Sequence, residues 1–404
     1  MTIPVHVRRQ SDISAALRWP VLGKPRVSIG TRKKRRRGNS SGVVVVHQHP
    51  DESDHEKASH MELARKIADL RMCQFAGVYD QKIRYPGAIY HVPGVTLIGT
   101  KAARKIGIIG ERDLFGGVAP FDFVATKAIV HPLVAAEASA PPGWSHAFAE
   151  AVRPIVLAGY TAFTPQDALQ GATLLLDRGE VRLKPVHALG GHGQIVVANG
   201  SELEAAIDRV GGTELAAGVV VEENLSNVTT YSIGRVSIGG MVATYSGTQH
   251  LTSDNAGAAT YGGSSLLVAR GGFEELLALH LTAQAQLAIS QARDFDRAAT
   301  QHFPELIASR RNYDVAQGLN ADGEWKSGVL EQSWRIGGAS AAEILALEAL
   351  RADPQLAAVE AACFEIFGGT KSSPENAFVY FRGVDRNAGA MTKYALIQAR
   401  HYAN

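Results

Sequence analysis

Two short runs of sequence decide the fold: VRLKP at residues 181–185 and LGGHG at residues 189–193. The first run alternates apolar and polar side chains, as a half-buried strand does, and it carries Lys184 near its end. A lysine there can hold a single charge at a fixed point. Because glycine has no Cβ, the backbone N–H groups of the second run can approach an anion closely. The alternative interpretation is a tight hairpin that binds nothing.

A second segment, Val219-Val220-Val221-Glu222-Glu223-Asn224-Leu225, follows further along the chain. Its three valines predict a buried strand, and the strand runs into an acidic connector. Such a connector could pass beside the edge of an adenine ring, with its backbone supplying the donor and the acceptor that adenine needs. The alternative is a buried strand with a solvated acidic end.

Two carboxylates occur near the end of the apolar pattern, in Arg311-Asn312-Tyr313-Asp314 and in the run from Val329 to Gly338. Asp314 and Glu331 on neighbouring strands could hold Mg²⁺ between the β- and γ-phosphates of a nucleotide. Arg335 stands two residues beyond Ser333 and could balance charge on a transferring phosphoryl group. Taken alone, each acid is more often a solvated or salt-bridged surface group.

The order and spacing of these three segments resemble the ATP-grasp superfamily, whose fold places two α+β subdomains around ATP. The resemblance covers about residues 120–350, and it implies ATP and Mg²⁺ as cofactors. It assigns the nucleotide to Lys127 and Lys184, the phosphate loop to Gly190, Gly191 and Gly193, the adenine hinge to Glu222, Glu223 and Leu225, the metal to Asp314, Glu331 and Ser333, and the reacting phosphate to Arg335.

One position departs from the superfamily pattern, which usually has asparagine two residues after the metal-binding glutamate. Here that residue is Ser333. A serine hydroxyl can bind Mg²⁺ directly or through water, but its reach is shorter. The whole chain also resembles a proteobacterial family of unknown function, a likeness that supplies no substrate.

The predicted fold class is α/β and α+β: an ATP-grasp fold preceded by a small α/β domain. We expect a basic, disordered leader over residues 1–42 and the small α/β domain over 43–120. The first part of the ATP-grasp fold, with the phosphate loop and the hinge, is expected over 121–225. The second part, with the metal site, is expected over 226–404.

Local patterns predict several elements within these boundaries. Residues 121–160 are expected to be mostly helical, with a break at Pro141-Pro142-Gly143 and a helix that resumes over 144–157, and residues 273–292 are expected to be a helical stretch. Thr164, followed by Pro165 and Asp167, predicts a helix start, as do Ser201 with Glu204 and Ser340 with Glu343. The glycine-punctuated run 229–245 predicts antiparallel hairpins. The histidines at 47, 49, 55 and 60 match no metal spacing and are interpreted as a polar loop.

Bulk composition limits the partners and the compartment. Hydrophobic residues make up 46% of the 404 residues, as in ordinary globular chains, and no apolar run reaches the length of a membrane span. Cys73 and Cys363 are the two cysteines, which fits a reducing cytoplasm. The basic run at 32–37 has no interleaved aromatic residues, which argues against a nucleic-acid partner.

These observations predict an ATP- and Mg²⁺-dependent ligase. It would activate a small-molecule carboxylate as an acyl phosphate for attack by an amine or thiol. Two alternatives stay open: a small-molecule kinase on the same fold, and a nucleotide-binding regulatory protein without turnover. The identities of the acid and of the nucleophile stay open as well, as does a homodimeric state.

Overall fold

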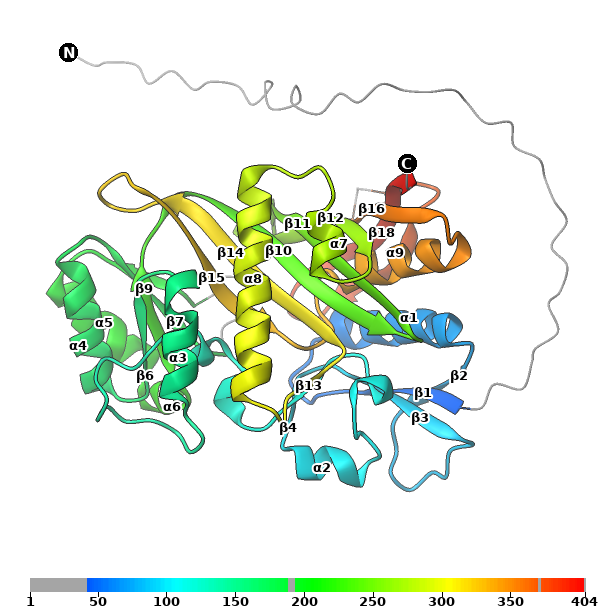
Figure 1. Ribbon diagram of the computed structural model, residues 1–404, viewed down its shortest axis with the longest axis horizontal. Helices are drawn as coiled ribbons and strands as arrows, with labels where there is room; N and C mark the ends of the chain where they lie inside the picture. The colour runs from blue at the N-terminus through cyan, green and yellow to red at the C-terminus, as the bar shows by residue number, and fades with distance from the viewer. Residues whose placement is uncertain (1–41, 188–192, 370–371, 403–404) are drawn as a thin grey trace, which may run out of the picture. The chain divides into compact units, whose positions relative to one another are not determined.

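The computed structural model describes residues 42–187, 193–369 and 372–402 (Figure 1). Most of the predicted basic leader, and the predicted Gly190 and Gly191, therefore lie outside the described residues. Within those residues, no helix is long and apolar enough to cross a membrane. The strands belong to sheets with the orders β2-β1-β3, β13-β5-β4, β6-β9-β7-β8 and β15-β14-β10-β11-β12-β16-β18-β17.

The chain first forms a small parallel sheet of β1 (Gly42–His47), β2 (Gln74–Val78) and β3 (Ala88–Pro93). The four valines of β1 are buried, which confirms the predicted core strand. Helix α1 (Asp54–Arg71) begins at a capping box in which the Ser53 hydroxyl accepts from the Glu56 N–H. The predicted polar loop around the histidines is therefore wrong for His47, which ends β1, and for His55 and His60, which lie in α1.

A second small sheet joins this region to a distant part of the chain. It pairs β5 (Gly117–Ala119) with β4 (Leu97–Ile98) in parallel and with β13 (Ile307–Ala308) antiparallel. The short helices α2 (Thr100–Lys105) and η1 (Glu111–Asp113) precede β5. The pairing with β13 ties the first α/β unit to the strands that carry the predicted metal site.

The prediction of a mostly helical segment over residues 121–160 is wrong, although helical structure does resume after Pro141-Pro142-Gly143, as expected. The structure has three short 3₁₀ helices and a single two-turn α-helix there: η2 (Asp122–Ala125), η3 (Lys127–Ile129), α3 (His146–Val152) and η4 (Arg153–Ile155). Prolines at 132, 141 and 142 oppose a continuous helix. The Gln332 amide also binds the carbonyl oxygens of Val124 and Thr126, at 2.7 and 2.9 Å, which removes acceptors that a helix would use.

A four-stranded antiparallel sheet follows, with α4 (Pro165–Leu176) and α5 (Gly200–Val210) packed on one face. Thr164 caps α4 as predicted, with its hydroxyl accepting from the Asp167 N–H. The cap predicted at Ser201 is wrong, because Asn199 accepts from the Glu202 N–H and starts α5 two residues earlier. The strands are β6 (Gly159–Ala162), β7 (Val181–Pro185), β8 (Ile195–Val197) and β9 (Val219–Glu223), and α6 (Gly212–Ala217) precedes β9.

The largest sheet has eight strands, and all of its neighbouring strands are antiparallel. The predicted hairpin is confirmed: β10 and β11 turn at Gly239-Gly240, which both have positive φ. The strands are β10 (Ser226–Ile238), β11 (Met241–Ser253), β12 (Ala259–Arg270), β14 (Arg310–Leu319), β15 (Trp325–Ser333), β16 (Leu356–Phe367), β17 (Phe378–Asp385) and β18 (Gly389–Tyr402).

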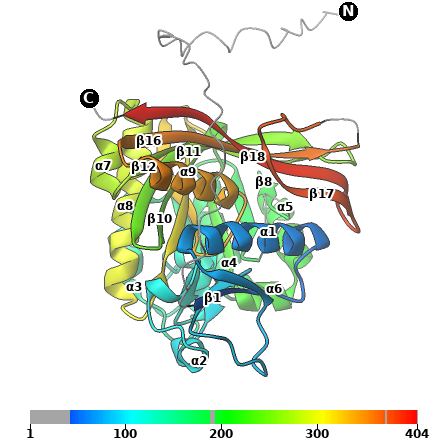
Figure 2. The same ribbon diagram turned by 90° about the vertical axis from the view of Figure 1, so that its right-hand side faces the viewer.

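Helices cover both faces of this sheet (Figures 1 and 2). Helix α8 (Ala283–His302) packs on the face that carries Ile233, whereas α1 and α9 (Ser340–Ala352) pack on the face that carries Val236. This division follows from the period of two along a strand. The helical stretch predicted over 273–292 is confirmed in part, because α7 (Phe273–Leu277) and α8 are helical whereas residues 278–282 between them are not.

A buried histidine pair makes the small parallel sheet sensitive to acid. His47 Nε2 lies 2.8 Å from His91 Nδ1, and burial lowers the pKa of both rings to about 4. Between pH 6.5 and pH 4 both rings therefore stay neutral in the folded protein. In the unfolded chain the same histidines have their ordinary pKa of about 6.5, so they take up protons in this pH range. We expect the free energy of unfolding to fall as pH drops from 6.5 towards 4, by about 2 kcal/mol per histidine at pH 5.

Urea unfolding measured from pH 7.5 to pH 5 checks this expectation. A His47→Gln/His91→Gln variant should show a shallower fall in stability across that range, because it has no histidine at either position. An equal slope in both proteins would show that other groups cause the acid sensitivity.

Candidate functional site

A cavity of about 1110 Å³ brings most of the predicted site residues together. Its walls come from the four-stranded sheet, the eight-stranded sheet and the first turns of α1. The predicted residues that line it are Lys184, Glu222, Glu223, Leu225, Asp314, Glu331, Ser333 and Arg335. Gly193, with φ +73°, and Lys127 do not line the cavity, but Lys127 Nζ lies 3.0 Å from Glu331 Oε2.

The two predicted metal ligands occupy matching positions on neighbouring strands. Asp314 of β14 pairs in register with Glu331 of β15, and Asn312 pairs with Ser333. Because successive side chains of a strand point to opposite faces of the sheet, these four side chains share one face. Tyr313 points to the other face, where it packs in the core with α8. Burial, and then the Glu331 carboxylate, raise the pKa of Asp314 to about 6.

The hydrogen bonds of Asp314 leave room for one metal bond. Its Oδ1 accepts from the Asn312 amide at 3.0 Å, and its Oδ2 accepts from the Gln249 amide at 2.9 Å. The Ser232 hydroxyl, which has one hydrogen, lies 3.2 Å from Asp314 Oδ1 and 3.0 Å from Asn312 Oδ1. Because each carboxylate oxygen has two lone pairs, Oδ2 keeps one that is free for a cation. Asp314 can therefore bind a cation through one oxygen, in a fixed orientation.

This donor set fits Mg²⁺. The described residues contain no group of three or more His, Cys, Asp or Glu side chains that could hold a metal. Mg²⁺, however, is usually bound by one or two carboxylates together with phosphate oxygens and water. Two carboxylates that repel each other across a strand pair, with Lys127 beside one of them, suit a cation shared with a phosphate chain.

Lys184 is held by Glu222, and Glu222 is held in turn by His131. Its ammonium forms an ion pair with Glu222, and Glu222 Oε2 lies 3.1 Å from His131 Nε2. All three side chains are buried. Burial alone would raise the pKa of Glu222, but Lys184 and His131 hold it at about 2. The side chain of Glu222 therefore positions Lys184, while its backbone belongs to strand β9.

The predicted adenine hinge is fixed from one side by Arg182. The Arg182 guanidinium donates to Asn224 Oδ1 at 2.7 Å and to Gln194 Oε1 at 3.0 Å, which links the hinge to the start of β8. The N–H groups of Glu223 and Asn224 bind the carbonyl oxygens of Ala158 and Glu180. The Leu225 N–H has no hydrogen-bond acceptor among the described residues.

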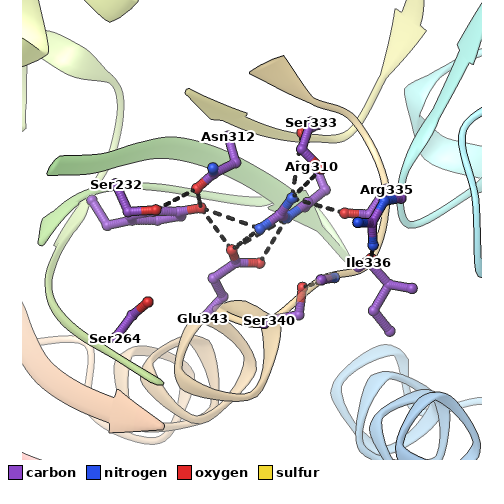
Figure 3. A network of polar contacts seen from close by, with 12 residues as sticks. Ser232, Ser264, Arg310, Asn312, Ser333, Arg335, Ile336, Ser340 and Glu343 are labelled. Carbon is purple, nitrogen blue, oxygen red and sulfur yellow. Dashed lines mark hydrogen bonds and ion pairs between the residues drawn. The ribbon is translucent and has the colours of Figure 1, made fainter. Parts of the chain in front are cut away.

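A buried ion pair lies beside the predicted metal-binding residues (Figure 3). Arg310 binds Glu343 of α9, with Nη2 2.7 Å from Oε1, and its Nη1 donates to the carbonyl oxygen of Arg335 at 2.8 Å. The Tyr245 hydroxyl lies 2.7 Å from both Glu343 Oε1 and Asn312 Oδ1. A continuous polar network thus runs from α9 to the amide that holds Asp314.

The same network corrects the predicted start of α9. Ala339 is the N-cap and provides no side-chain hydrogen bond, whereas the Ser340 hydroxyl accepts from the Gly337 N–H at 3.0 Å. Glu343 is 1% exposed and turns to Arg310 rather than to the helix end. A capping-box pattern and a buried ion-pair partner look alike in sequence, since both need a glutamate in the first turn.

Arg335 lies where a bound anion would offset the positive charge of two neighbouring guanidinium groups. Burial, and then the Arg310 guanidinium, lower the pKa of Arg335. The hydrogen bond that it makes, from Nη1 to the Ile336 carbonyl oxygen at 2.9 Å, leaves most of its N–H groups without an acceptor among the described residues. Two guanidinium groups in one buried region favour a bound phosphate or carboxylate.

Several residues of the site escaped the sequence analysis. Asn312 stood inside a quoted motif, and strand alternation with Asp314 could have identified it. Three further residues come from β10 and β11: Ser232, Tyr245 and Gln249. Their distance in sequence from the predicted metal ligands gave no signal that they lie close to them in space. The remaining residues carry no local signal, because their partners lie on distant elements. They are His131, Arg182, Arg310, Glu343, Glu365 and Lys393.

The architecture is similar to that of solved structures of other proteins. N5-Carboxyaminoimidazole synthetase from Staphylococcus aureus superposes with a TM-score of 0.51 at 10% identity, over 89% of this chain and 93% of that one. The same enzyme complexed with ADP gives a TM-score of 0.50 at 10% identity, with 89% and 93% coverage. Together with the sheets and the cavity, these likenesses define the ATP-grasp fold.

The sequence also places the chain in a known family. The chain belongs to the family described as "Protein of unknown function (DUF3182)", whose model matches residues 43–395. No protein with a curated function matches the chain in sequence.

Removing the charge of Glu343 should destabilise the protein strongly. Glu343→Gln leaves the Arg310 guanidinium buried without its counter-ion, so we expect a loss of about 3–5 kcal/mol in the free energy of unfolding. The matched control is Glu150→Gln, which breaks the exposed Arg153–Glu150 pair and should cost less than about 1 kcal/mol. Chemical denaturation of both variants makes the comparison, and similar losses would contradict a supporting role for the buried pair.

Proposed function

We propose that this protein is an ATP- and Mg²⁺-dependent ligase that activates a carboxylate as an acyl phosphate. The observation that carries the proposal is the shared cavity, which gathers Lys184, Asp314 and Glu331 from two separate sheets and Arg335 from the connection after β15. Two basic groups and two carboxylates in one cavity suit a triphosphate with its metal ion. The ATP-grasp fold supports the same proposed function.

The nucleotide would lie between the two sheets. The Leu225 N–H, which has no acceptor among the described residues, would donate to the adenine ring, and the backbone of Glu222 or Glu223 would accept from it. Lys184 would contact the phosphates from β7. Asp314 Oδ2 and Glu331 would face the metal, with Lys127 beside Glu331. Mg²⁺, when bound, neutralises the β- and γ-phosphates.

The proposed reaction needs no nucleophilic side chain. A substrate carboxylate oxygen attacks the γ-phosphorus, and the bond to the β-phosphate oxygen breaks, so that ADP leaves. An amine or thiol then attacks the acyl carbon, loses its proton and displaces inorganic phosphate. Arg335 would stabilise charge on the transferring phosphoryl group, and the rigid polar network around Arg310 would keep its loop in place.

A nucleotide-binding protein without turnover is the second candidate. Ser333 favours it, because the residue replaces asparagine and its hydroxyl accepts a long hydrogen bond, 3.4 Å, from Arg310 Nη1. The Asn312 side chain opposite does not replace the missing amide, since it already binds Asp314 and accepts from Tyr245. A small-molecule kinase would share the first half of the ligase reaction.

A screen of metabolite pools for ATP turnover separates the candidates. A ligase should release both ADP and inorganic phosphate, and the release should require an acid together with a nucleophile. A kinase would release ADP and keep the phosphate in its product. Asp314→Asn should abolish turnover in either case, because it removes a metal-binding carboxylate. Tight ATP binding without any turnover would favour the regulatory protein and would contradict the ligase.

ATP affinity tests the role of Lys184. Lys184→Met should weaken binding by about 1.5–3 kcal/mol, the range for hydrogen bonds to charged groups. Lys184→Arg should retain part of the affinity. The control is Lys326→Met, which removes an exposed lysine of β15 that pairs with Glu324 and does not line the cavity.

Titration calorimetry, with the thermal midpoint recorded for each variant, gives the comparison. The midpoint matters because Lys184→Met leaves the Glu222 carboxylate buried beside His131 alone. An unchanged ATP affinity in a folded Lys184→Met protein would contradict the assignment.

A further inference from the structure

A second ion pair lines the same cavity and has no part in the proposed nucleotide site. Lys393 of β18 pairs in register with Glu365 of β16, and Lys393 Nζ lies 2.9 Å from Glu365 Oε1. The two side chains are 8% and 11% exposed, and both line the cavity. A buried ion pair is a poor source of stability, because desolvation offsets the attraction between its charges. A ligand that uses the pair would explain its position.

The pair keeps hydrogen-bonding capacity towards the cavity. An ammonium group has three donors, and among the described residues Lys393 Nζ has one acceptor, Glu365 Oε1. Glu365 Oε2 accepts no hydrogen bond from the described residues, and it is not one of the polar atoms that are fully enclosed without a partner. One cationic donor and one anionic acceptor therefore face the cavity side by side.

The groups around the pair come from distant parts of the chain. His55 of α1 lies close enough that the Lys393 ammonium adds to burial in lowering its pKa. The His55 N–H is bound by Asp385 Oδ2 at 2.9 Å, which fixes the start of α1 against β17. Tyr261 and Tyr380 also line this part of the cavity and give it partly apolar walls. The small α/β unit and the last strands thus build this end together.

The pair carries no net charge, and this restricts the kind of ligand that it can bind. A simple anion at Lys393 would be repelled by Glu365, and a simple cation at Glu365 would be repelled by Lys393. A dipolar group with adjacent positive and negative charges complements both residues at once. We propose that this end of the cavity binds the head group of a free amino acid, with its carboxylate on Lys393 and its ammonium on Glu365. As a substrate assignment this rests on the proposed ligase function; as a binding site it does not.

Binding of amino acids without nucleotide tests the inference. Saturation-transfer NMR on the full chain would use an equimolar mixture of the twenty standard amino acids. Parallel samples would contain their N-acetyl derivatives and their amides. We expect one or a few free amino acids to bind, and the matching derivatives, which lack one of the two charges, to bind at least about tenfold more weakly. Equal binding of the derivatives, or no binding at millimolar concentration, would overturn the proposal.

A double replacement avoids leaving a charge unpaired. Glu365→Met/Lys393→Met removes both charges and should fold, since hydrophobic residues often replace a buried ion pair without loss of stability. The matched control is Lys66→Met/Glu348→Met, which removes an ion pair of the same length, 2.9 Å, outside this cavity. We expect the first variant to lose amino-acid binding by at least about tenfold and the control to keep it. Retained binding in the first variant would overturn the assignment.

ATP binding measured on the same samples separates this inference from the proposed function. Nucleotide binding without amino-acid binding would overturn the subsite and leave the ligase proposal standing. Amino-acid binding that depends on Lys393 and Glu365, without nucleotide binding, would support the subsite and contradict the ligase.

Discussion

The ion pair between Arg310 and Glu343 is the interaction on which the rest of the site depends. Arg310 begins β14, Glu343 belongs to α9, and the same guanidinium holds the carbonyl oxygen of Arg335 in the connection between β15 and α9. Three segments of the chain are thus fixed by one buried side chain. Because both charges are almost fully desolvated, neither can move far without leaving the other unpaired.

The order imposed by this pair reaches the proposed metal site through short steps. Tyr245 contacts Glu343 and Asn312, and the Asn312 amide binds Asp314. Strand alternation keeps Asn312 and Asp314 on the cavity face and places Tyr313 in the core under α8. Rigid side chains around a carboxylate leave its free lone pair in one direction. This geometry suits a site that must hold a cation and a phosphate chain at fixed positions.

Much of the architecture could be predicted because it follows from local patterns. The valines of β1 and β9 predict buried strands, Thr164 predicts a helix start, and the glycines at 239–240 predict a hairpin. The errors arise where tertiary contacts override local preference. Gln332 takes the carbonyl groups that a helix near Val124 would need, and Glu343 turns to Arg310 instead of capping α9.

The sequence by itself determined the order of the proposed nucleotide-site residues, from Lys127 through Lys184 and Glu222 to Asp314, Glu331 and Arg335. Several of them carry a local signal: Lys184 and Glu222 stand near the ends of apolar strands, and Arg335 stands just before two glycines. The tertiary structure alone decided that Glu222 pairs with Lys184, that Arg310 lies beneath Arg335, and that His55 meets Lys393. The physical reason is that an ion pair depends on distance in space. Residues 55 and 393 become neighbours only when the small α/β unit packs against the last strands.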